Sequence, residues 1–171
     1  MKTVEIKVYQ FSELSEDAKN KAIQNLSDIN VNFEWWEFTY EDAKNIGLEI
    51  QSFDLDRNRH AKGQFLYFAN EVAANILKEH GDTCNTYLTA FNFMEDWQPI
   101  FNDYMDVNSE NYESRDLENQ LQDLEDEFLN SLLEDYSILL QKESEYLQSE
   151  KAIIETIELN EYDFTEDGKL F

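Results

Sequence analysis

The chain has 171 residues, 42% of them hydrophobic and 14% aromatic, which is enough apolar material for a folded core. Its 13 basic and 38 acidic residues give a formal net charge of −25. That charge excludes nucleic-acid binding by phosphate neutralisation and argues against anionic membrane surfaces. It favours a basic partner, or it serves solubility alone.

The sequence also indicates the cellular compartment of the protein. Cys84 is the only cysteine, so no internal disulfide can form and a reducing compartment is expected. Residues 1–10 are charged and alternating, unlike the apolar part of a signal peptide, and no apolar run approaches 18 residues. We therefore expect a cytoplasmic protein.

The first third of the chain predicts a strand followed by two helices. Alternating apolar residues give a strand over residues 3–11, and a helix is expected over residues 15–29. A second helix is predicted over residues 33–46. Trp35 and Trp36 fall within it, and two adjacent side chains cannot both face the core of a helix. One of them is therefore a candidate for contacting a partner; the alternative is that these aromatic residues fill the core.

The middle of the chain predicts a β-hairpin and then more helices. Strands are expected over residues 48–55 and 63–68, joined by a basic loop, DRNRHAK, whose arginines we expect to pair with the neighbouring acids. Helices follow over residues 70–78 and after Thr83, and Pro99 is expected to break or restart the second of them.

The longest predicted element is a helix of about ten turns over residues 113–149, which contain no Pro or Gly. Residues 95–150 hold 2 basic and 17 acidic residues, a net charge of −15. One stripe of the helix is apolar, and the opposite face carries Asp116, Asp123, Asp126, Glu127, Glu134 and Glu145. A solvated surface is the plain interpretation of such a face. However, few basic residues lie within the helix to offset the repulsion between its acids, so some compensation is expected.

A second apolar ridge runs along the later part of this helix, at Leu129, Leu133, Leu140 and Leu147. Such a ridge needs a cover. We expect either the helix predicted over residues 150–159 or a second copy of the protein, which would make a homodimer. Residues 161–171 predict a hairpin around Asp167-Gly168.

These elements predict an α+β fold, mostly helical, with a small antiparallel sheet packed by helices and one long acidic helix in the C-terminal half. We expect a single domain over residues 1–171. Within it, residues 1–94 would form a core of sheet and helices, and residues 95–171 an acidic helical region ending in a hairpin.

No motif for catalysis or metal binding stands out. The run from Asp54 resembles the start of a calcium loop but has Arg59 and Phe65 where such a loop needs Gly and Glu. His80 and Cys84 lack a second pair of zinc ligands. No phosphate loop or nucleophile motif occurs. We therefore predict no catalytic residue, no metal, no cofactor and no enzymatic activity.

Three segments, FSELSEDAKNKAIQNL, NFEWWEFTYEDAKNIGLEIQSFDLDRNRHAKGQF and ELNEYDFTEDGKLF, resemble a family of uncharacterised small acidic proteins of phages and prophages. The resemblance carries no catalytic residue. In charge and size the chain is also similar to anti-restriction and anti-CRISPR proteins that imitate nucleic acid.

The leading hypothesis is therefore a phage or mobile-element inhibitor of a host defence nuclease. Its acidic surface would occupy the nuclease's basic groove. The candidate partner-binding residues are Asp96, Asp103, Asp106, Asp116, Asp123, Asp126, Glu127, Glu134, Glu145, Trp35 and Trp36. The alternative is a regulatory or antitoxin-like interaction protein that binds through aromatic or apolar patches.

Overall fold

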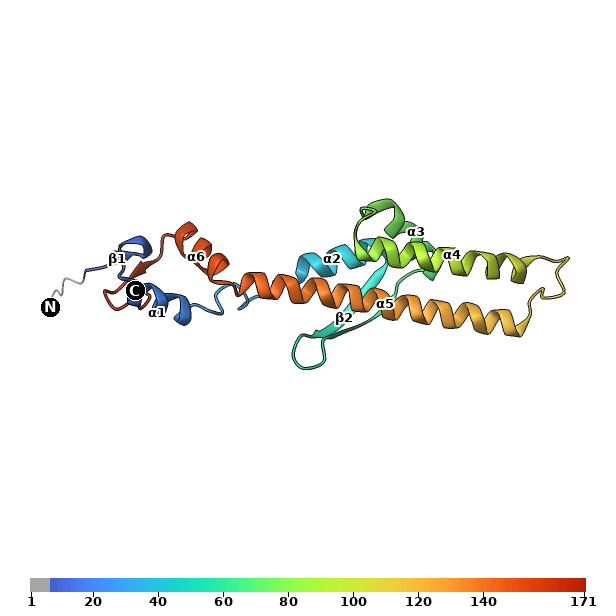
Figure 1. Ribbon diagram of the computed structural model, residues 1–171, viewed down its shortest axis with the longest axis horizontal. Coiled ribbons are helices and arrows are strands. Elements are labelled where there is room, and N and C mark those ends of the chain that lie inside the picture. The colour runs from blue at the N-terminus through green and yellow to red at the C-terminus, as the bar shows by residue number, and fades with distance from the viewer. Residues whose placement is uncertain (1–6) are drawn as a thin grey trace. The chain divides into compact units, whose positions relative to one another are not determined.

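The computed structural model describes residues 7–171 (Figure 1). The predicted fold class is confirmed: the described chain is mostly helical, with two small antiparallel sheets. The long acidic helix is α5, Arg115–Leu147. Of the strand predicted over residues 3–11, the described part contains β1, Tyr9–Gln10; residues 3–6 lie outside the described residues.

The chain forms two compact units. That it is a single domain stays a prediction. Residues 36–141 make the central unit. The terminal unit combines the chain up to Trp35 with Lys142–Phe171. The predicted boundary after residue 94 lies inside helix α4, Asn85–Met105. Sequence periodicity gives no sign of this division, because the terminal unit is assembled from both ends of the chain.

The terminal unit pairs β1 with β4, Asp163–Phe164, in antiparallel register. Helices α1, Glu16–Asn25, and α6, Glu150–Leu159, are each capped by a serine hydroxyl that accepts a backbone N–H. A short 3₁₀ helix, Phe11–Glu13, follows β1. The predicted C-terminal hairpin around Asp167-Gly168 is present: Phe164 bridges Leu170, and the Thr165 N–H donates to the Lys169 carbonyl oxygen at 2.8 Å.

The core of the terminal unit draws on both ends of the chain. Buried side chains from the first part and from the last part pack in one cluster: Phe11, Leu14, Ala18, Ala22, Ile153, Ile157 and Phe164. These residues explain why two sequence-distant segments form one body, since neither segment alone can bury its apolar face.

The central unit begins with helix α2, Glu37–Ile46, which ends at Gly47 in a left-handed conformation (φ 96°). The hairpin of β2, Leu48–Asp54, and β3, His60–Phe65, follows, with a register shift between Ile50 and Ser52. Helix α3, Ala69–Glu79, leads into α4.

Helices α4 and α5 lie side by side in the central unit, joined by the loop 106–114 (Figure 1). Phe93 of α4 stacks on Phe128 of α5, with ring centroids 4.2 Å apart and an interplanar angle of 9°. Trp97 Nε1 donates a hydrogen bond to Glu125 Oε1 at 3.1 Å. These contacts fix the register of the two helices.

Pro99 does not break a helix, contrary to the prediction, because α4 runs through it from Asn85 to Met105. Pro99 is on the exposed side, so water can satisfy the backbone carbonyl that its missing N–H leaves free. Its neighbour Trp97 is buried and stacks on Phe101 at 4.4 Å. Packing of these aromatic residues outweighs the local cost of the proline.

The chain itself buries two of the four leucines of the predicted dimer ridge, so these two cannot contact a second copy, and the homodimer stays a prediction. Leu133 and Leu140 are only 7% and 0% exposed. The hairpin lies over Leu133: a Cβ built on Gly63 of β3 would come within 3.1 Å of its Cδ2. Leu129 packs against the core of the central unit. A β-hairpin far away in the sequence therefore covers Leu133.

Candidate partner-binding site

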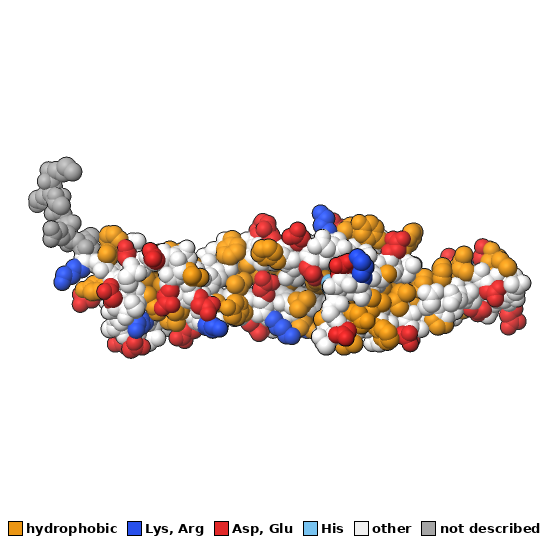
Figure 2. All heavy atoms as spheres, turned by 90° about the horizontal axis from the view of Figure 1, so that it is seen from above, with side chains coloured by type: hydrophobic (Ala, Val, Ile, Leu, Met, Phe, Trp, Pro, Cys, Tyr) orange, Lys and Arg blue, Asp and Glu red, His pale blue; other side chains and the backbone are white. Residues whose placement is uncertain are grey.

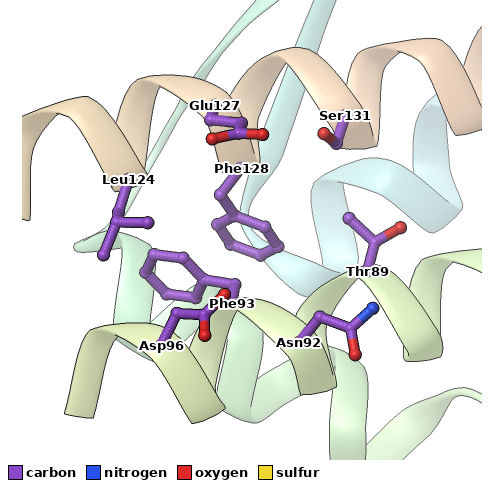
Figure 3. A pocket seen from close by; sticks show the side chains of 8 residues that line it. All are labelled: Thr89, Asn92, Phe93, Asp96, Leu124, Glu127, Phe128 and Ser131. Carbon is purple, nitrogen blue, oxygen red and sulfur yellow. The ribbon is translucent and has the colours of Figure 1, made fainter. Parts of the chain in front are cut away.

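The pairing of α4 and α5 leaves a groove between them, with two adjoining cavities. The cavity nearer Phe93 and Phe128 has a volume of about 230 Å³, and Figure 3 shows its lining side chains projecting from both helices. The groove as a whole, called the α4–α5 groove below, is lined by Thr89, Asn92, Phe93, Asp96, Asp123, Leu124, Asp126, Glu127, Phe128, Asn130, Ser131, Glu134 and Asp135.

Four of the predicted acidic residues line this groove and take part in no ion pair of the described chain. Asp96 comes from α4, and Asp123, Asp126 and Glu127 come from α5; all four are exposed. None of the ion pairs within residues 7–171 involves them. Across the face seen in Figure 2, acidic side chains clearly outnumber basic ones. Within the described residues, these four carboxylates of the groove thus have no internal counterion.

Glu134 is also in the groove, but it is already paired. The guanidinium of Arg59, from the loop between β2 and β3, binds the Glu134 carboxylate. Its Nε and Nη1 donate to Ser137 Oγ (3.1 Å) and Gln141 Oε1 (2.7 Å). The arginine was expected to pair with acids of its own loop, and that expectation is wrong for Arg59. It supplies the compensation that the acidic helix was expected to need, and it excludes Glu134 from the free acidic surface.

Asp135 closes one end of the groove and was not predicted. It accepts a hydrogen bond from Thr89 Oγ1 at 2.7 Å, which links α5 to α4. Burial raises the pKa of the Asp135 carboxyl, the Thr89 hydrogen bond lowers it, and the negative charge of Glu134 raises it further, for a net rise. Its position could have been found from helical spacing, because Glu127, Ser131 and Asp135 follow one another at intervals of four.

Asp103 and Asp106, two of the predicted partner-binding residues, organise the loop between α4 and α5. Asp103 accepts hydrogen bonds from Ser109 Oγ and Asn111 Nδ2, and Asp106 accepts one from the backbone N–H of Asn108 at 2.9 Å. The bonds from Ser109 and Asn111 lower the pKa of Asp103. Asp and Asn residues commonly stabilise turns in this way. The carboxylates shape the turn that brings α5 back along α4.

The remaining predicted residues are dispersed. Asp116 is exposed in the first turn of α5 and does not line the groove, and Glu145 belongs to the terminal unit. Helix α2 begins at Glu37, so the two tryptophans precede it. Trp35 is only 8% exposed, and Trp36 packs edge-on against Phe53 at 5.5 Å. The prediction that one tryptophan must face a partner assumed that both lie in a helix, and that assumption was wrong.

Another polar cluster joins three elements of the central unit. The buried Tyr136 hydroxyl donates to Asp42 Oδ2 at 2.8 Å, and His80 Nε2 lies 3.8 Å from Asp42 Oδ1. Burial first, and then the Asp42 carboxylate, raise the pKa of Tyr136 well above its ordinary range, so the phenol remains a donor. His80 Nδ1 lies 2.7 Å from Thr86 Oγ1. This cluster ties α2 and α5 to the end of α3.

Cys84 lies beside the same cluster, at the N-terminus of α4. Its Sγ is 2.9 Å from the Gly81 carbonyl oxygen and 3.3 Å from Thr86 Oγ1. In the described part of the chain, no group of three or more His, Cys, Asp or Glu side chains is placed to hold a metal ion.

No helix within residues 7–171 has the length and apolar character needed to cross a bilayer. Comparisons with protein-family models, with curated proteins and with solved structures found no match to this chain.

Proposed function

We propose that this chain is a non-enzymatic inhibitor, made by a phage or mobile element, that uses the α4–α5 groove to bind the nucleic-acid-binding surface of a host defence nuclease. The observation that carries the proposal is the meeting of Asp96, Asp123, Asp126 and Glu127 on one exposed groove without an internal cation. A partner rich in Lys and Arg would relieve the repulsion among these carboxylates.

The charge density of α5 supports nucleic-acid imitation. Residues 116–135 contain eight acids, and a helix of this length spans about 29 Å at roughly 1.5 Å per residue. Without Glu134, which is paired with Arg59, the other seven give roughly one negative charge per 4.1 Å, compared with one per about 3.4 Å along a single DNA strand. A nuclease groove built for phosphates would therefore meet a similar linear density of charge, although these residues point in several directions around the helix.

The test uses defence nucleases captured from the native host and then purified. The chain is expected to inhibit DNA cleavage competitively with DNA, to bind more weakly as salt rises, and to show no affinity for DNA itself. Inhibition that is unchanged between low and high salt, or that survives replacement of the groove acids by amides, would contradict the proposal.

A second candidate function rests on aromatic exposure. Phe38 and Phe68 are 80% and 78% exposed in the central unit, and large exposed aromatic residues are typical of protein-binding surfaces. In that case the chain would be a regulatory or antitoxin-like interaction protein, with its charge serving solubility. Binding would then be lost on Phe38→Ala and Phe68→Ala and retained on neutralisation of the groove acids.

A further inference from the structure

We propose that the cavity between α4 and α5 receives one arginine side chain of the basic partner, with its guanidinium held between Asp96 and Glu127. This inference rests on the proposed function, because that proposal supplies the basic partner. It adds the chemical group that is recognised and the place where it binds.

The cavity combines an apolar floor with a charged rim. Its floor is formed by Leu124 and the stacked rings of Phe93 and Phe128. Asp96 on α4 and Glu127 on α5 flank the rings from the two helices (Figure 3). A volume of about 230 Å³ greatly exceeds the roughly 30 Å³ that one water molecule occupies in the liquid. A long side chain with an apolar stem and a cationic head fits such a cavity.

Arginine suits this arrangement better than lysine. Its planar guanidinium carries five N–H donors in a fixed fork, and it is less strongly hydrated than an ammonium group. It can therefore bond two carboxylates from different helices while its methylene groups cover the apolar floor. Thr89, Asn92 and Ser131 add side-chain oxygens to the lining, which can accept the remaining N–H groups.

The chain already binds one guanidinium on the same helix. Arg59 engages a carboxylate, a hydroxyl and an amide oxygen of α5, at Glu134, Ser137 and Gln141. About two turns earlier, Glu127 and Ser131 also supply a carboxylate and a hydroxyl, four residues apart where Glu134 and Ser137 are three apart. No ion pair within residues 7–171 involves Glu127 or Asp96. The cavity thus offers a guanidinium partners of the same kinds as those that hold Arg59.

The test is an NMR titration of the full chain with N-acetyl-arginine amide, using N-acetyl-lysine amide and sodium chloride at matched ionic strength as comparators. With the arginine compound, the largest chemical-shift changes are expected at Phe93, Leu124, Phe128 and Ser131. Lysine is expected to bind several-fold more weakly. Equal affinity for the two compounds, or shifts spread evenly over the acidic residues, would overturn the proposal.

Two kinds of variant separate shape from charge. Ser131→Leu fills the cavity without changing the net charge and is expected to weaken arginine binding at least tenfold. The pair Asp96→Asn and Glu127→Gln is expected to weaken it about tenfold, since exposed ion pairs contribute up to about 1 kcal/mol each and 1.4 kcal/mol is a factor of ten. The matched pair Asp116→Asn and Glu118→Gln lies outside the cavity and should leave binding unchanged.

Thermal unfolding of each variant shows whether the fold is kept. If Ser131→Leu fails to fold, Asn92→Leu, at an exposed position of α4 that lines the same cavity, takes its place. Arginine binding that persists in a folded cavity-filling variant would overturn the proposal.

The same variants distinguish this inference from the proposed function. If amide replacement of the groove acids abolishes nuclease inhibition but folded Ser131→Leu inhibits normally, the acidic groove binds the partner and the arginine cavity is refuted. If the arginine compound binds as expected but no nuclease is inhibited, the cavity chemistry stands and the proposed function fails.

Discussion

Arg59 and Glu134 form an ion pair between the β2–β3 loop and helix α5, across 75 residues of sequence. The arginine is the countercharge that α5 lacks in its own sequence, and it holds the hairpin on the helix. Because Arg59 occupies Glu134, the free acidic surface lies on the N-terminal side of that residue.

Arg59→Lys is therefore expected to lower the free energy of unfolding by about 1 kcal/mol, because an ammonium cannot make the three contacts of the guanidinium fork and the pair is partly exposed. Chemical denaturation measures the change. Arg57→Lys, at an exposed position of the same loop, is the control and should change stability by less than about 0.5 kcal/mol. Equal effects of the two substitutions would contradict the role of Arg59.

Neutralising the free groove acids separates binding from folding. The triple variant Asp123→Asn, Asp126→Asn and Glu127→Gln should weaken nuclease binding tenfold or more, yet unfold at the same or a higher temperature, because repulsion among like charges is removed. The matched triple Asp28→Asn, Glu158→Gln and Glu166→Gln changes the same charge in the terminal unit. Binding affinity by calorimetry should fall only for the groove variant. A similar fall for both would mean that net charge alone matters.

Tyr136→Phe removes a buried hydroxyl and its hydrogen bond to Asp42. The expected loss is about 1 kcal/mol of unfolding free energy, the usual net value of one such bond. Tyr146→Phe is the control, since that hydroxyl is exposed and lies 3.3 Å from Glu155 Oε2; its effect should stay below about 0.5 kcal/mol. An unchanged stability for Tyr136→Phe would show that this bond does not hold α2 to α5.

Gly168→Ala should strongly destabilise the terminal unit. The residue has a φ of 81°, and an added Cβ would lie 2.1 Å from the Ala18 carbonyl oxygen. Strain in this left-handed conformation and the backbone clash together predict a loss of more than about 2 kcal/mol. Gly81→Ala has open space around it and is expected to change stability by no more than about 1 kcal/mol. Thermal unfolding distinguishes the two, and similar stabilities would contradict the close packing at Gly168.

Asp135 gives a pH-dependent prediction. Its pKa is raised in the folded state, chiefly by burial, so the fold favours the protonated acid over the charged form. The resulting stability is present below the unfolded value of about 3.9 and is lost as the pH rises through the folded pKa. Asp135→Asn keeps an acceptor for Thr89 and removes the charge. Relative to the natural sequence, this variant should therefore be stabilised more at pH 7 than at pH 4. Urea denaturation at the two pH values measures the difference, and the reverse order would contradict the burial effect.

Much of the local structure was predictable from the sequence. The long helix over residues 113–149 is observed as Arg115–Leu147, because its apolar period and lack of Pro or Gly decide helix formation locally. Gly47 ends α2 in a left-handed conformation and the Ser15 hydroxyl caps α1, both in line with local residue preferences. Pro99 was misread because its effect depends on which side of α4 faces solvent, and tertiary packing decides that.

The acidic character of α5 was determined by the sequence itself, since helical spacing alone gathers Asp123, Asp126 and Glu127 on one side. Only the tertiary structure decided which acids are free. Asp96 joins the groove because α4 packs along α5, Arg59 removes Glu134 from it, and Asp103 is used within a loop. These outcomes depend on contacts between residues far apart in the chain. The hydrophobic periodicity and charge pattern of the sequence describe only residues that are close together along the chain.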